Sequence, residues 1–97
     1  MRDPVVAAVS QRTAAAVPGV ARLHDLAWRP SGRGRSRGRG VEVERTGDGL
    51  VVTVRLVVSR GRPVIDVVHT VQRSVHDELL RCTGLAAEVV VIVVDLD

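Results

Sequence analysis

The chain has 97 residues, of which 45% are hydrophobic, and this excludes both a disordered chain and a second domain. The net charge is only +3, so overall charge does not single out a nucleic-acid-binding protein. The lone cysteine, Cys82, excludes a disulfide within the chain and suits a reducing compartment. A membrane-spanning helix needs about 20 apolar residues, more than the longest apolar run, Val89 to Val94, offers.

The N-terminal quarter predicts a helix followed by a weak strand. Asp3 and Pro4 suit the N-cap and the first position of a helix. Apolar residues then recur at helical spacing as far as Val17, where a Pro-Gly pair ends the helix. An irregular alternation over residues 20–26 indicates a strand.

Residues 29–40 are rich in arginine, glycine and serine and predict a flexible basic loop between two strands. One interpretation is a solvated loop without a ligand. Another is a site for an anionic surface, either a membrane or, less favoured, a nucleic acid, because Arg-Gly binders of RNA usually add aromatic stacking platforms and Trp28 is the only aromatic residue. The candidate anion-binding residues are Arg33, Arg35, Arg37 and Arg39.

The middle of the chain predicts a β-hairpin. Residues 41–44 alternate valine with glutamate, and the Asp48-Gly49 pair is a typical hairpin turn. Residues 50–58 then form a long strand whose even-numbered positions, all apolar, share one face.

The last third predicts a helix and a final strand. Apolar residues from Val64 to Cys82 recur at helical spacing, and Asp77 and Arg81 are placed for an i,i+4 ion pair. Gly84 is expected as the left-handed cap, and a strand follows over residues 88–96.

The order of elements, α-β-β-β-α-β, predicts an α+β fold: a four-stranded mixed sheet with both helices on one face. The second helix is the crossover that makes the last strand parallel to the strand over residues 50–58. The order of the strands within the sheet stays open.

The last strand also predicts an interface. We expect Val90, Ile92 and Val94 to face the helices, so that the intervening valines and two valines of the neighbouring strand face away. An exposed apolar patch of this kind usually marks a contact with a partner or another copy, unless the strand is central and covered from within the chain. The candidate interface residues are Val89, Val91, Val93, Val51 and Val57.

No motif for catalysis, a cofactor or a metal ion is found. The sequence has no Gly-x-Ser-x-Gly elbow and, lacking lysine, no Walker-type loop. His69 and His76 lie two helical turns apart, roughly 10 Å, which is too far for one small ion. We therefore expect a protein that is not an enzyme and that binds no cofactor, metal ion or small-molecule substrate.

Several short segments occur in order along the chain: Val-Pro-Gly-Val at 17–20, Gly-Val-Glu-Val at 40–43, Gly61 with Pro63 and Val64, Val71-Gln72, and Thr83-Gly84-Leu85. Together they resemble the alkaline shock protein family of small bacterial envelope-stress-response proteins. The resemblance implies a non-enzymatic, self-associating adaptor or scaffold. It also implies a cytoplasmic protein that lies at the inner face of the cell membrane through a membrane-anchored partner. A small nucleic-acid-binding domain that uses the Arg/Gly loop is the alternative.

Overall fold

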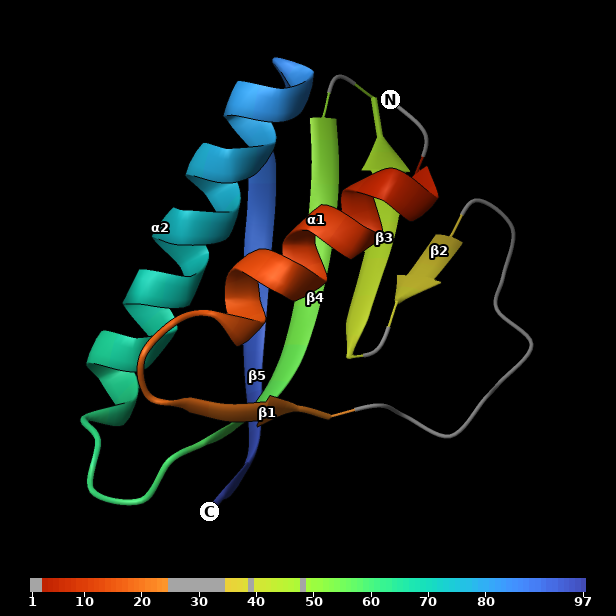
Figure 1. The fold of residues 1–97 in the computed structure, drawn as a ribbon. Coiled ribbons are helices and arrows are strands. Elements are labelled where there is room, and N and C mark those ends of the chain that lie inside the picture. The colour runs from red at the N-terminus through yellow and green to blue at the C-terminus, as the bar shows by residue number, and fades with distance from the viewer. Residues whose placement is uncertain (1–2, 25–34, 39, 48) are drawn as a thin grey trace.

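The computed structural model describes residues 3–24, 35–38, 40–47 and 49–97, so most of the predicted basic loop, Arg33 and Arg39 included, lies outside the described residues. Within these described residues, two helices and five strands follow one another (Figure 1). They are α1 (Asp3–Ala15), β1 (Val20–Leu23), β2 (Arg35–Gly38), β3 (Val41–Thr46), β4 (Gly49–Val58), α2 (Val64–Thr83) and β5 (Ala87–Leu96). The predicted α+β class and the order of the longer elements are confirmed.

β4 is the central strand of one mixed sheet. β5 pairs with it in parallel along one edge, from the Leu50–Ala87 pair onward. The other edge of β4 is shared: β3 pairs antiparallel with its first part and β1 with its last part, while β2 pairs with β3 further out. The parallel β4–β5 pair confirms the predicted crossover through α2.

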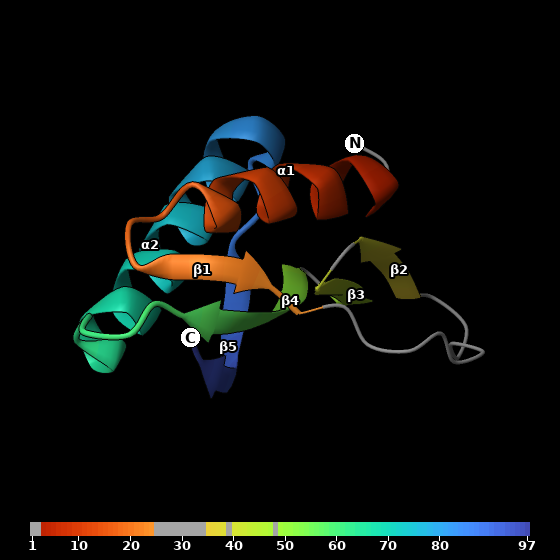
Figure 2. The ribbon, with the colours of Figure 1, turned by 60° about the horizontal axis from the view of Figure 1, so that its bottom comes forward.

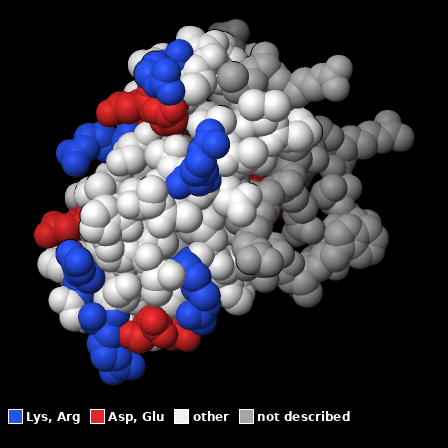
Figure 3. All heavy atoms as spheres, in the orientation of Figure 1, with Lys and Arg blue, Asp and Glu red and all other residues white. Residues whose placement is uncertain are grey.

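Both helices lie on one face of the sheet, as predicted (Figures 1 and 2). The apolar core fills the space between the helices and the sheet, and it includes the even-numbered residues of β4 from Leu50 to Val58 together with Val71, Val75 and Leu79 of α2. Figure 3 shows this helix-covered side, where charged side chains of both signs lie mainly toward the α2 side of the molecule, with uncharged surface between them. No helix of the described residues lies on the opposite face of the sheet (Figure 2).

Gly40, between β2 and β3 in the chain, lies where the end of β1 and the beginning of β3 meet beside β4. Its φ of +71° is in the left-handed region, and a Cβ there would lie 2.8 Å from Leu23 Cβ. The Arg55 N–H donates to the Gly40 carbonyl at 2.8 Å, and the Arg55 carbonyl accepts from the His24 N–H at 2.8 Å. Glycine therefore lets β1 and β3 meet end to end beside β4 without steric overlap.

The predicted loop over residues 29–40 contains a strand that the sequence did not indicate. β2 pairs with β3 so that Arg35 lies opposite Glu44 and Arg37 lies opposite Glu42. The composition of this segment favours a loop, but strand formation depends more on cross-strand neighbours than on intrinsic preference. The four-stranded sheet of the prediction is thus extended by one short strand.

Candidate interaction surfaces

The side chains of β5 alternate in the opposite sense from the prediction. Val89, Val91 and Val93 are partly buried and pack against the core beneath the helices. Val90 and Ile92, which were expected to face the helices, are each 39% exposed on the other side. The prediction that the valines at 89, 91 and 93 form an open interface is therefore wrong in its assignment of faces.

The pairing of β5 with β4 explains which residues of β5 face the helices. Val91 pairs with Val54 and Val93 pairs with Leu56, both buried on the helix-covered face, and residues directly opposite each other in a sheet point to the same face. The pairing shifts after Val93, so that Val57 pairs with Asp95 and Val94 becomes the extra residue of a β-bulge.

The two interface candidates on β4 have different environments. Both lie on the open face, because the residues that flank them in the strand are buried on the helix-covered side. Val51 is half-buried, which leaves part of its surface for a partner. Val57 is only 1% exposed, and it lies in register between Arg22 of β1 and Asp95 of β5. Val57 is therefore already covered within the chain, and its assignment to an interface is wrong.

The open face nevertheless carries an apolar stripe. We define the open-face stripe as Val90, Ile92 and Val94, which are 39%, 39% and 38% exposed. Glu88 lies at the beginning of this stripe and Asp95 at its end, and both are exposed. The predicted patch on the open face therefore exists, but it is formed by the residues that alternate with those predicted.

The structure describes the backbone of only two of the four candidate arginines. Arg35 and Arg37 belong to β2, while Arg33 and Arg39 lie outside the described part of the chain. Their binding to an anionic surface stays a prediction.

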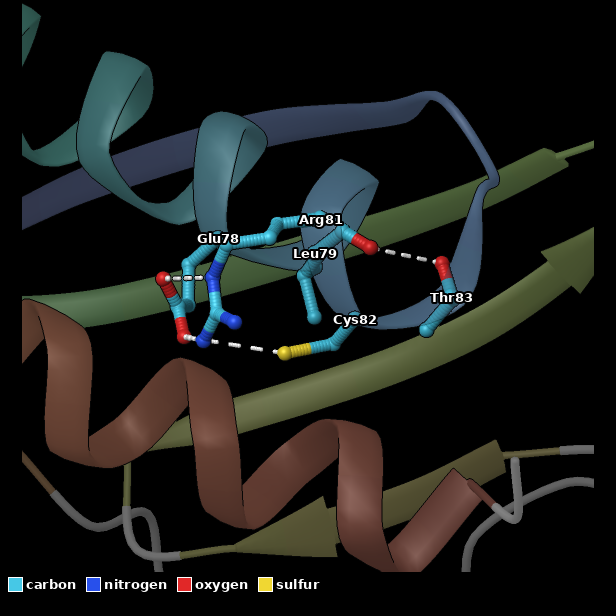
Figure 4. A network of polar contacts seen from close by, with 5 residues as sticks. All are labelled: Glu78, Leu79, Arg81, Cys82 and Thr83. Carbon is cyan, nitrogen blue, oxygen red and sulfur yellow. Dashed lines mark hydrogen bonds and ion pairs between the residues drawn. The ribbon is translucent and has the colours of Figure 1, made fainter.

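A polar cluster near the end of α2 stabilises the helix surface (Figure 4). Arg81 was expected to pair with Asp77, but it forms an ion pair and hydrogen bonds with Glu78, and Asp77 instead contacts His76 at 3.2 Å. The Cys82 thiol donates to Glu78 at 3.6 Å. Hydrogen bonding from Arg81 lowers the pKa of Glu78 below its ordinary value of 4.5. These contacts follow the i,i+3 and i,i+4 spacing of a helix surface.

The described residues form neither a metal-binding cluster nor a membrane-spanning helix. Among them, no three side chains of histidine, cysteine, aspartate or glutamate converge as metal ligands would. None of the helices that they form is both long enough and apolar enough to cross a membrane.

The fold is thus that of a small α+β domain with one helix-covered face and one open face of its sheet. The chain belongs to the alkaline shock protein family: the model of this family, which is described as having a cell envelope-related function, matches residues 1–96. None of the curated proteins matches the chain. Among solved structures, the MamM CTD in its copper form is similar, with a TM-score of 0.58 at 13% sequence identity over 96% of this chain and 85% of that one. At this identity the similarity concerns the fold alone.

Proposed function

We propose that this protein is a non-enzymatic, self-associating adaptor of the cell envelope, held at the inner face of the cytoplasmic membrane by a membrane-anchored partner. Membership of a family with an envelope-related function supports the cellular context. The observation that carries the self-association is the open-face stripe, because nothing within the described chain covers it. Neither observation calls for chemistry at a catalytic centre.

A second copy is the occupant that fits the open face. The stripe is flanked by charges of both signs, with Arg55 beside it on β4 and Glu88 and Asp95 at its ends. A face that carries both signs around an apolar centre can be complementary to itself across a two-fold axis. A nucleic acid would meet the acidic groups unfavourably, and this supports self-association over the nucleic-acid alternative.

The strength of this association follows from the area that remains to be covered. Fully burying an aliphatic side chain contributes about 1.5–3 kcal/mol. The six stripe side chains of two copies are each about two-fifths exposed, so together they contribute roughly 4–7 kcal/mol in a dimer. This is close to the lower estimates of the cost of association, about 4 kcal/mol, so contacts of Val51 and Thr53 must add to it. With these contacts the net gain is at most about 4 kcal/mol, so we expect a dissociation constant on the order of 1 mM. A partner that concentrates copies at the membrane makes such weak contacts effective.

Sedimentation over roughly 0.1 to 3 mM protein tests self-association, because that range spans the expected dissociation constant. The wild type should gain mass with concentration, whereas Val90→Thr with Ile92→Thr should stay monomeric and folded by circular dichroism. The matched control is Val5→Thr with Ile65→Thr, which changes two exposed apolar residues on the helices and should associate like the wild type. A wild type that is monomeric throughout this range would refute the proposal.

Cell fractionation tests the membrane part separately. The protein should be found partly with the membranes and should be released by salt or alkali, as a peripheral protein is. A protein that stays in the cytosolic fraction, in cells that contain the partner, would contradict this part alone.

A further inference from the structure

The far edge of β5 is free among the described strands, because β5 pairs only with β4. Its backbone groups alternate between the two sides. The Ala86 carbonyl accepts from the Leu50 N–H of β4, while the Val89 carbonyl points the other way and accepts from the Gln72 side chain at 3.3 Å. By this alternation, the N–H and C=O groups of Val91 and Val93 also point outward from the sheet.

Such an edge is an open template for another strand. Edge strands in native proteins are usually short, charged or covered, and β5 has ten residues with an uninterrupted apolar centre. Gln72 supplies the Val89 carbonyl with the donor that the N–H of a neighbouring strand would otherwise supply. Gln72 therefore satisfies the beginning of the edge, and the outward groups of Val91 and Val93 are the part left for a partner strand.

A groove runs between this edge and one side of α2. It has a volume of about 360 Å³ and is lined by His69, Gln72, Arg73, His76, Ala87 and Val89. The four residues from α2 follow the i, i+3, i+4, i+7 spacing that places them on one side of a helix. The β5 side of the groove, formed by Ala87 and Val89, is therefore its apolar floor. The α2 side is its wall and is formed by basic and amide side chains.

The charge of this wall selects the occupant. None of the lining residues is acidic, and the Arg73 side chain is exposed there. The nearest acidic group on the helix, Asp77, is already in contact with His76. A carboxylate on the incoming strand would therefore find an arginine partner in the groove, whereas a basic side chain would be repelled.

We propose that the groove between α2 and β5 binds an extended segment of another protein, which adds to the free edge of β5 as a sixth strand and carries an acidic side chain opposite Arg73. The backbone of β5 would form the hydrogen bonds that give affinity, and the side chains of α2 would determine which sequences bind, as in other cases of β-strand addition. This site rests on the proposed function in one respect, because an adaptor must bind a partner as well as another copy of itself. The groove and the open-face stripe are different surfaces.

The test uses a blocked, fluorescein-labelled heptapeptide of alternating threonine and valine with a central glutamate, and two versions with glutamine or lysine at the centre. Fluorescence anisotropy should show that the glutamate peptide binds the wild type at least tenfold more tightly than the glutamine peptide. Arg73→Glu should abolish this preference and should instead favour the lysine peptide. The control, Arg62→Glu, removes an exposed arginine outside the groove and should bind like the wild type.

Amide hydrogen exchange of the wild type locates the peptide without any variant that risks unfolding. Saturating peptide should slow exchange at the outward N–H groups of Val91 and Val93. No saturable binding at millimolar peptide, or an affinity that is unchanged by Arg73→Glu, would overturn the proposal. So would protection of these amides that rises with protein concentration alone, because a second copy would then occupy the edge.

The same measurements separate this site from self-association. The monomeric variant Val90→Thr with Ile92→Thr should bind the glutamate peptide as tightly as the wild type does. If the wild type does not associate but binds the peptide, the groove stands and the proposed self-association fails. If it associates through the open face but binds no peptide, the groove fails alone.

Discussion

The alternation of β5 yields a sharp prediction, because neighbouring residues of one strand should respond in opposite ways to the same change. We compare Val91→Thr with Val93→Thr against Val90→Thr with Ile92→Thr. Threonine keeps the branched Cβ and the preference for strands, so what differs between the two pairs is the face of the sheet. Val91 and Val93 pack against the core, whereas the other pair is exposed.

The expected loss of stability follows from this burial. A fully buried valine contributes at least about 1.5 kcal/mol, and Val91 and Val93 are partly buried, so each change should cost about 1 kcal/mol and the pair about 2 kcal/mol. For a domain of this size, that lowers the melting temperature by roughly 8–16 °C. The open-face pair should change stability by no more than about 0.5 kcal/mol, because surface substitutions seldom do more.

Urea denaturation followed by circular dichroism measures both effects. The protein should be at low micromolar concentration, where the wild type is monomeric, because association would otherwise add to the apparent stability of the folded state. Equal destabilisation by the two pairs, or a larger loss for Val90→Thr with Ile92→Thr, would refute the assignment of faces.

Three further outcomes are expected. Gly40→Ala should lower the free energy of unfolding by more than about 2 kcal/mol, because it combines a left-handed φ with overlap at Leu23. Gly61→Ala is the control: its φ is +88° but no atom lies within 4 Å of the added Cβ, so it should cost only the backbone strain of about 1–2 kcal/mol. Arg81→Met should raise the pKa of Glu78 back toward 4.5 in an NMR titration, and an unchanged pKa would exclude Arg81 as the cause. Because the pKa of Glu78 is lower in the folded state, the stabilisation by this pair is complete above pH 4.5 and is lost as the pH falls through the lowered value. Replacing the four candidate arginines, Arg33, Arg35, Arg37 and Arg39, with serine should abolish co-sedimentation with anionic vesicles but leave binding to neutral vesicles unchanged. Binding to anionic vesicles that survives these changes would show that this segment is not the anionic-surface site.

The regular elements could be predicted from the sequence because each has a local signal. The helical spacing of Val71, Val75 and Leu79 predicted the buried side of α2, and these residues are buried there. Gly84 was expected as the left-handed cap, and it has a φ of 73° with its N–H bonded to the Leu80 carbonyl. The alternation of β3 and the Asp-Gly turn likewise predicted the hairpin with β4.

The faces of β5 could not be predicted in the same way, because valine or isoleucine occupies both faces and leaves no alternation to follow. Two polar residues give conflicting signals. Glu88 is exposed, and it belongs to the same alternation as Val90 and Ile92, so it indicates the correct phase. Asp95 belongs to the other alternation and indicates the opposite phase, and only the β-bulge at Val94 reconciles the two.

The sequence by itself thus determined the two helices, the hairpin, the parallel crossover and the family, because local spacing, turns and caps specify them. Only the tertiary structure decided which side of β5 is exposed, that Arg35–Gly38 pairs with β3, and that α2 and the free edge of β5 enclose a groove. These features depend on register and packing between segments that are distant in the chain, and a local pattern carries no information about such contacts when both faces of a strand are apolar.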